Sequence, residues 1–79
     1  MEQDFKFGAT LMRLRRGRQL TQRDLAERCE RSSNQISDLE RGIRQPSPAT
    51  FFKIAEALDL LPSELLIECE IIQKRYSKN

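Results

Sequence analysis

The sequence contains no histidine and no tryptophan, and its 79 residues include only three glycines, three prolines and two cysteines. Without histidine, and with Cys29 and Cys69 far apart, the chain cannot form an ordinary zinc site. It also lacks a glycine-rich phosphate loop and a cluster of carboxylates in an apolar setting, and its serines have no activating base. We therefore expect no enzyme, no metal and no cofactor.

Long apolar runs are also missing. No stretch approaches the ~20 apolar residues of a membrane span, and the start Met-Glu-Gln-Asp lacks the basic and apolar regions of a secretory signal. Both cysteines fall at apolar positions of helical patterns, which predicts free, buried thiols and fits a reducing compartment. We expect a cytoplasmic protein that makes no membrane contact.

Charged residues are abundant but unevenly distributed. The chain has 14 Lys and Arg against 12 Asp and Glu. Residues 1–44 carry ten of the basic and seven of the acidic side chains, whereas residues 45–79 carry four and five. The capacity to bind phosphate is therefore concentrated in the first part of the chain. A solvated helical surface explains the same counts equally well, so charge alone decides nothing.

Apolar side chains recur at helical spacing, and no segment resembles a pair of strands. The pattern predicts one all-α domain over residues 1–79, with a first helix over about 5–18, capped by Asp4, and a fifth over about 62–73. Between them, three helices begin at the capping residues Thr21, Ser32 and Ser47. The side chains expected in the core are Phe7, Leu11, Leu14, Leu25, Ala26, Cys29, Ile36, Leu39, Phe51, Ile54, Ala55 and Leu58.

The second and third helices are short and joined by a tight turn, an arrangement that can place a helix in the major groove of DNA. Ile36 and Leu39 face the core from the third helix. Its opposite face carries the hydrogen-bonding side chains Ser33, Asn34, Ser37, Asp38 and Arg41. Asn34 can pair with the N6/N7 edge of adenine, and Asp38 can accept a hydrogen bond from cytosine N4. Taken singly, each is equally explained as an exposed helix residue, with Asp38 neutralised by Arg41 or Arg31.

Binding also requires donors to the DNA phosphates. Gln22 lies in the first turn of the second helix, where free backbone amides and the helix dipole favour an anion. Arg41 and Arg44 follow at the end of the third helix. Arg23 and Arg31 are further candidates, although exposed arginines without a partner are common on any helical protein.

The order of these residues resembles the Cro/C1-type, or lambda-repressor-like (XRE), helix-turn-helix family of phage repressors and small bacterial regulators. The resemblance covers residues 7–66 and leaves 67–79 as the end of the fifth helix and a polar tail. It is carried by Gly8, Leu14-Arg15, Leu20-Thr21-Gln22, Leu25-Ala26, Ile36-Ser37, Leu39-Glu40-Arg41-Gly42, Pro46-Ser47, Ile54-Ala55, Ala57-Leu58 and Glu64-Leu65-Leu66.

The resemblance implies a compact five-helix fold and a dimer that reads a near-palindromic operator in double-stranded DNA. The family's base-reading positions fall on Ser33, Asn34 and Asp38, with Ser32 close enough to touch the groove. Its phosphate contacts fall on Gln22 and Arg41. It further implies a structural ion pair between Arg15 and Glu40, which argues against counting Arg15 as a DNA contact.

Three features depart from the family pattern. The turn between the second and third helices has Glu30-Arg31 where Gly and an apolar residue are usual, so Glu30 is expected to be strained and Arg31 to reach a phosphate. Asp59 replaces the usual Gly after the fourth helix. Leu60-Leu61-Pro62 leaves the fifth helix without a polar N-cap.

The fifth helix has more apolar residues than one contact with a small core requires. Leu65, Leu66 and Cys69 form an inward side, continued by Ile72 and Tyr76. We expect the remaining apolar side chains to contact a second copy of the chain. The residues expected at this contact are Leu61, Ile67, Ile71 and Ile72.

We therefore interpret the chain as a homodimeric transcriptional regulator that acts on its own promoter, encoded by a bacterium or phage. It resembles Cro-like proteins and the controller proteins of restriction–modification systems. Repression and activation stay open, and Asp24 and Glu27 are candidates for contact with RNA polymerase. The alternative is an antitoxin whose fifth helix holds a toxin, although toxin-wrapping antitoxins usually carry a longer extension after this helix.

Overall fold

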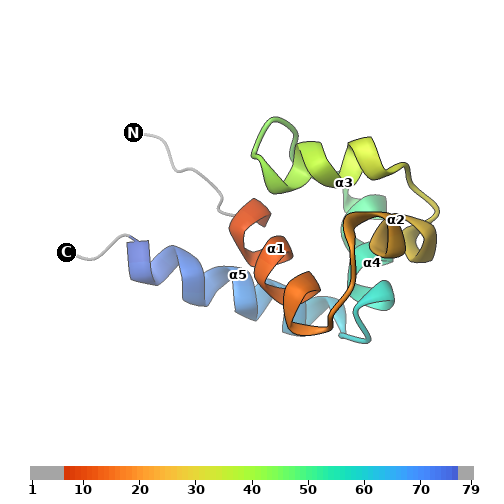
Figure 1. Ribbon diagram of the computed structural model, residues 1–79. Helices are drawn as coiled ribbons and strands as arrows, with labels where there is room; N and C mark the ends of the chain where they lie inside the picture. The colour runs from red at the N-terminus through yellow and green to blue at the C-terminus, as the bar shows by residue number, and fades with distance from the viewer. Residues whose placement is uncertain (1–6, 77–79) are drawn as a thin grey trace.

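The protein's computed structural model describes residues 7–76, and from residue 71 onward it describes the backbone but not the side chains. Five helices follow one another: α1 (Phe7–Gly17), α2 (Gln22–Cys29), α3 (Ser33–Glu40), α4 (Pro48–Ala57) and α5 (Pro62–Tyr76). In Figure 1, α1 lies between α3 and α5, and α3 occupies an outer edge of the molecule. The predicted all-α, five-helix class is confirmed.

The starts of α2, α3 and α4 are fixed by the side chains that the sequence predicted. The Thr21 hydroxyl accepts from the Asp24 N–H at 2.9 Å, and the Asp24 carboxylate accepts from the Thr21 N–H at 2.9 Å. Ser32 and Gln35 form the same reciprocal box before α3. Ser47 caps α4 and Pro48 follows it at the first position, which needs no amide donor. Each cap satisfies backbone groups that a helix start leaves unpaired.

The core forms where the five helices meet, and it contains the side chains expected from helical spacing. Leu11, Leu25 and Ile54 are fully buried, and Phe51 is half-buried with its ring 5.8 Å from that of Phe7. The thiols of Cys29 and Cys69 are buried and unbridged. Over residues 7–76, no helix is both long enough and apolar enough to cross a membrane.

The ends of the fold differ from the sequence-based expectation. α1 begins at Phe7, and its expected cap, Asp4, lies outside the described residues. α5 continues to Tyr76, three residues beyond the predicted end at Gln73. The expectation that Leu66 faces inward is wrong: its side chain is 51 % exposed, because Leu65 takes the inward position one residue earlier.

The start of α5 has a polar partner that the sequence did not suggest. Leu61 cannot cap with its own side chain, but its N–H donates to Glu64 Oε1 at 2.8 Å. This is one half of the capping box formed at α2 and α3.

Two arginines donate hydrogen bonds to carbonyl oxygens at the C-terminal end of α4. Arg18 Nε donates to the Leu58 carbonyl oxygen at 2.9 Å, and Arg28 Nη1 donates to the Ala57 carbonyl oxygen at 3.3 Å. Cations at this end also interact favourably with the helix dipole. These two basic side chains therefore belong to the scaffold.

Candidate nucleic-acid interface

The position of α3 is set from behind by apolar contacts and by a close approach to α1. Ile36 and Leu39 are 0 % and 3 % exposed, so they fasten one side of the helix to the core. Gly8 of α1 lies so near that a Cβ added there would be 2.5 Å from the Glu40 carbonyl oxygen. α3 therefore sits against α1 with its other side turned outward (Figure 1).

The outward side of α3 presents the polar residues named from the sequence. Ser33 and Asn34 are exposed, and Ser37 and Asp38 are half-buried. Ser32 is exposed too, but its hydroxyl is engaged in the cap, accepting from the Gln35 N–H at 3.1 Å. The structure thus brings the five predicted base-reading residues together on one surface, at the start and along the length of α3.

The turn before α3 adopts the strained conformation expected of Glu30. Its φ and ψ are 59° and 43°, in the left-handed region, where a residue with a Cβ costs about 1–2 kcal/mol. The Lys53 ammonium lies 2.8 Å from Glu30 Oε1 and holds the pKa of that carboxyl below its ordinary value. Gln19 and Asp59 have positive φ as well, at 58° and 60°.

The Arg31 side chain forms hydrogen bonds within the protein. Its Nε and Nη2 donate to Thr50 Oγ1 at 3.3 and 3.2 Å, and Nη1 donates to the Glu30 carbonyl oxygen at 3.2 Å. These bonds fasten the turn to α4. This engagement argues against the expectation that Arg31 reaches a phosphate.

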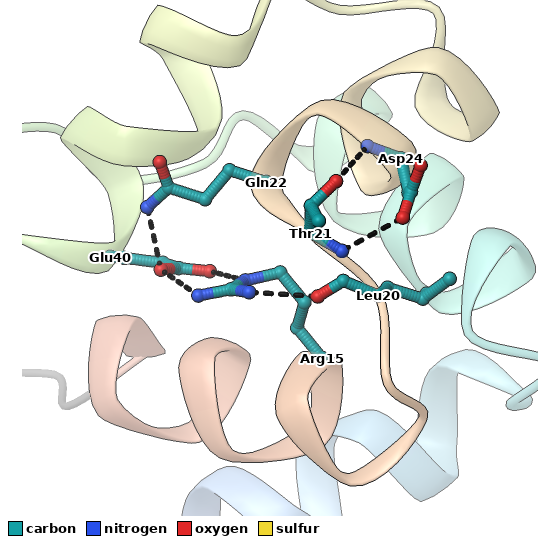
Figure 2. A network of polar contacts seen from close by, with 6 residues as sticks. All are labelled: Arg15, Leu20, Thr21, Gln22, Asp24 and Glu40. Atoms are coloured by element: carbon teal, nitrogen blue, oxygen red, sulfur yellow. Dashed lines mark hydrogen bonds and ion pairs between the residues drawn. The ribbon is translucent and has the colours of Figure 1, made fainter.

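A buried polar network links α1, α2 and α3 beneath the predicted interface (Figure 2). Arg15 Nε lies 2.6 Å from Glu40 Oε2 and Arg15 Nη2 lies 3.1 Å from Glu40 Oε1, which forms the ion pair implied by the family resemblance. Arg15 Nη1 also donates to the Leu20 carbonyl oxygen at 2.8 Å. The hydrogen bond to Glu40 raises the pKa of Arg15, so the guanidinium stays charged despite its burial.

Gln22 joins this network from the first position of α2. Its Nε2 donates to Glu40 Oε1 at 3.0 Å, while its amide oxygen points away from Glu40 (Figure 2). A carboxamide nitrogen has two hydrogens, so the second one stays available to another acceptor. Sequence reasoning did not identify Glu40 as a partner of Gln22, because 18 residues separate them and no local pattern joins them.

The basic residues after α3 are also partnered. Arg41 Nη2 lies 3.3 Å from Asp38 Oδ1, and Arg44 Nε lies 3.7 Å from Asp38 Oδ2. Both arginines are exposed, as is Arg23 on α2. Asp38 is therefore neutralised by Arg41 and Arg44. Arg31, the other candidate named from the sequence, contacts Thr50 instead.

The residues proposed for dimerisation are only partly described. Leu61 and Ile67 are 62 % and 52 % exposed, whereas the side chains of Ile71 and Ile72 lie outside the described residues. Among the residues that the structure describes, no group of His, Cys, Asp and Glu is arranged to hold a metal ion.

Comparison with known proteins decides the family. Residues 6–66 match the helix-turn-helix domain family. The chain belongs to that family. The matched span runs from the start of α1 into α5, so it contains the α2–α3 pair and the polar surface of α3.

Individual relatives agree with this assignment. The chain is 39 % identical over 59 residues to the HTH-type transcriptional regulator y4dJ of Sinorhizobium fredii. The aligned residues cover 75 % of this chain and 77 % of the relative. The structure of this chain resembles that of the clp gene regulator ClgR of Corynebacterium glutamicum, with a TM-score of 0.86 and 28 % identity. The match covers 94 % of this chain and 79 % of ClgR.

A second solved structure is similar. The restriction-modification controller protein C.AhdI of Aeromonas hydrophila matches with a TM-score of 0.73 and 38 % identity, covering 77 % of this chain and 92 % of that protein. Together these likenesses confirm the Cro/C1-type assignment. This helix-turn-helix protein is a DNA-binding transcriptional regulator of a non-enzymatic family.

Proposed function

We propose that this helix-turn-helix protein is a homodimer that reads a near-palindromic operator with α3 in the major groove and controls its own promoter. The observation that carries the proposal is the outward polar surface of α3, which is fastened from behind by Ile36 and Leu39. Short polar side chains on a rigid helix allow close approach to base edges.

Base reading is assigned to Ser32, Ser33, Asn34, Ser37 and Asp38. Asn34 is exposed near the start of α3, where a recognition helix meets base edges, and its carboxamide suits adenine N6/N7. The three serines donate or accept without fixed preference. Asp38 is half-buried and negatively charged, so it favours a base that presents a donor.

Phosphate binding is assigned to Gln22, Arg41 and Arg44, with Arg23 beside Gln22 in the first turn of α2. Glu40 holds one N–H of the Gln22 amide, and the second N–H donates to a phosphate oxygen. The first backbone amides of α2 have no partner within the helix and favour the same anion. Such contacts strengthen binding to all sequences alike.

Dimerisation is assigned to the apolar side chains that α5 and the segment before it leave uncovered. Leu61, Leu66 and Ile67 are each more than half exposed. In the proposed dimer these residues meet their counterparts, and Ile71 and Ile72 extend the contact. The likeness to the controller protein C.AhdI over 92 % of that protein's length supports the controller role. A controller protein acts on DNA, so the proposed location is the bacterial cytoplasm.

The test of the whole proposal is selection of binding sites from random duplex DNA with the purified chain. We expect an inverted repeat whose half-sites are centred about one helical turn (~34 Å) apart. Enrichment of a lone half-site, or of no sequence, would contradict the two-fold arrangement.

The antitoxin alternative uses the same exposed side chains of α5 for a heterologous protein. Sedimentation at tens of micromolar separates the two hypotheses: we expect a dimer that Ile67→Glu converts to a monomer. Ile43→Glu is the matched control, because Ile43 is 63 % exposed in the loop after α3, and α1 lies between α3 and α5 (Figure 1). A wild-type chain that sediments as a monomer would favour the antitoxin role.

A further inference from the structure

Asp38 lies between two arginines on the outward side of α3. Its Oδ1 is 3.3 Å from Arg41 Nη2, and its Oδ2 is 3.7 Å from Arg44 Nε. The Asp38 side chain is 27 % exposed, while those of Arg41 and Arg44 are 62 % and 57 % exposed. Each carboxylate oxygen therefore faces one guanidinium, and both guanidinium groups remain open to solvent.

The backbone also holds Arg44 close to Asp38. The Asp38 carbonyl oxygen accepts from the Ile43 N–H at 3.0 Å and from the Arg44 N–H at 3.3 Å. Gly42, with φ +77°, lets the chain turn back over the last turn of α3. Arg44 is thus kept beside Asp38 by its main chain as well as by its side chain.

This arrangement conflicts with the phosphate contacts proposed for the two arginines. A guanidinium that moves onto a phosphate gives up its ion pair with the carboxylate, and once both have moved Asp38 is left in the groove without a partner. Guanine N7 and O6, adenine N7 and thymine O4 are all acceptors, which repel a carboxylate. Adenine also presents an N6 donor, but beside its N7 acceptor, whereas cytosine presents the N4 donor without an acceptor on the same base edge. An unpaired charge removed from water is unfavourable.

We propose that Asp38 determines specificity by exclusion: it retains Arg41 and Arg44 unless a cytosine amino group takes their place, and so weakens binding to other DNA. The inference rests on the proposed function, since it requires α3 to enter the groove. It assigns to one carboxylate both a preference for one base pair per half-site and a reduced affinity for random duplex.

The test uses Asp38→Asn, which keeps the shape of the side chain and removes its charge. At ~0.15 M salt we expect affinity for random duplex to rise about 3- to 10-fold, because two phosphate donors are released. At the C·G pair that the wild type selects, replacement by the other pairs costs the wild type about tenfold or more. The same replacements cost Asp38→Asn less than about threefold.

Two controls separate this mechanism from a general charge effect. Glu56→Gln changes the net charge equally at an exposed position of α4, and we expect unchanged discrimination. In an Arg41→Gln/Arg44→Gln background, we expect Asp38→Asn to raise affinity for random duplex by less than it does in the wild type, because no arginine is left to release and only the repulsion of the unpaired carboxylate is removed. Circular dichroism checks that each variant is folded.

The outcomes are distinguishable. A wild type that discriminates among sequences, with an Asp38→Asn variant that discriminates equally, overturns the exclusion role and leaves the proposed function intact. An equal gain on random duplex from Glu56→Gln overturns it as well. A wild type that prefers no sequence overturns the proposed function itself.

Discussion

Arg15 and Glu40 meet in a two-point ion pair, with Nε 2.6 Å from Oε2 and Nη2 3.1 Å from Oε1, and so fasten α1 to α3 (Figure 2). Their side chains are 9 % and 0 % exposed. The pair is therefore almost wholly out of water, where removal of one partner leaves an uncompensated charge. The same carboxylate also accepts from Gln22 at 3.0 Å, so one residue serves both the packing of α3 and the orientation of a predicted DNA contact.

Replacing one partner of this pair is expected to destabilise the fold strongly. Glu40→Ala leaves Arg15 buried without its carboxylate, and breaking a buried pair costs about 3–5 kcal/mol of unfolding free energy. Urea denaturation followed by circular dichroism measures the loss. Arg15→Met/Glu40→Leu is the control, because an apolar pair of similar volume restores most of the stability. A double variant no more stable than Glu40→Ala would contradict the electrostatic explanation.

Gln22 and Asn34 are expected to affect DNA binding in different ways. Gln22→Ala removes a phosphate donor, so affinity falls about tenfold on the selected operator and on random duplex alike. Asn34→Ala removes a base contact, so the loss is confined to the operator and to one base pair, at about 1–3 kcal/mol. Fluorescence anisotropy on both duplexes measures the two patterns. Equal losses on both duplexes for Asn34→Ala would refute its role in base reading.

The features predicted correctly from the sequence depend on residues that are close in the chain. The capping hydroxyls of Thr21 and Ser32 are recognisable because each partner lies three residues later. The strain at Glu30 was predictable from the family resemblance, because a glycine is usual at this position of the turn. Gln19, two residues after the end of α1, has the same backbone conformation, but no neighbouring pattern marks it as a left-handed position.

The missed features depend on contacts across the fold. Arg18 and Arg28 were indistinguishable from surface charges, because their acceptors are backbone carbonyl oxygens 40 and 29 residues away, which leave no trace in the sequence. The contact of Arg31 with Thr50 was missed for the same reason, since Thr50 lies on another helix. The exposure of Leu66 depends on the rotation of α5 against the core, which an almost continuous apolar pattern does not specify.

The two buried thiols make stability depend on alkaline pH. Burial raises the pKa of Cys29 and of Cys69 above the ordinary value of 9.0. A thiol whose pKa is raised in the folded state stays protonated after the unfolded chain has ionised, so unfolding free energy falls as pH rises beyond about 9. The slope is at most about 1.4 kcal/mol per pH unit for each thiol.

Urea denaturation between pH 8 and 10 measures this dependence. Cys29→Ala is expected to remove one thiol's share of the slope, and Cys69→Ala the other's. Lysine and tyrosine also titrate in this range, but they do so equally in the wild type and in both variants. Identical slopes in all three proteins would rule out the thiols as the cause.

Gly8 and Gly17, both in α1, are expected to respond oppositely to alanine. A Cβ at Gly8 would lie 2.5 Å from the Glu40 carbonyl oxygen and 2.6 Å from that of Leu39. Both atoms are backbone, so α3 must move away from α1, and such overpacking costs typically about 1–3 kcal/mol. A Cβ at Gly17 would meet no atom within 4 Å. Gly17→Ala therefore increases stability, by up to about 1 kcal/mol, through helix propensity.

Thermal unfolding measures the two changes, and DNA binding gives the functional consequence. In Gly8→Ala the displacement falls on the end of α3, where Glu40 orients Gln22, so operator affinity drops even at temperatures where the variant is fully folded. Gly17→Ala keeps wild-type affinity. If Gly8→Ala unfolded earlier but bound the operator as the wild type does once folded, the close approach of α1 would matter for stability alone, and α3 would not need its exact position to read DNA.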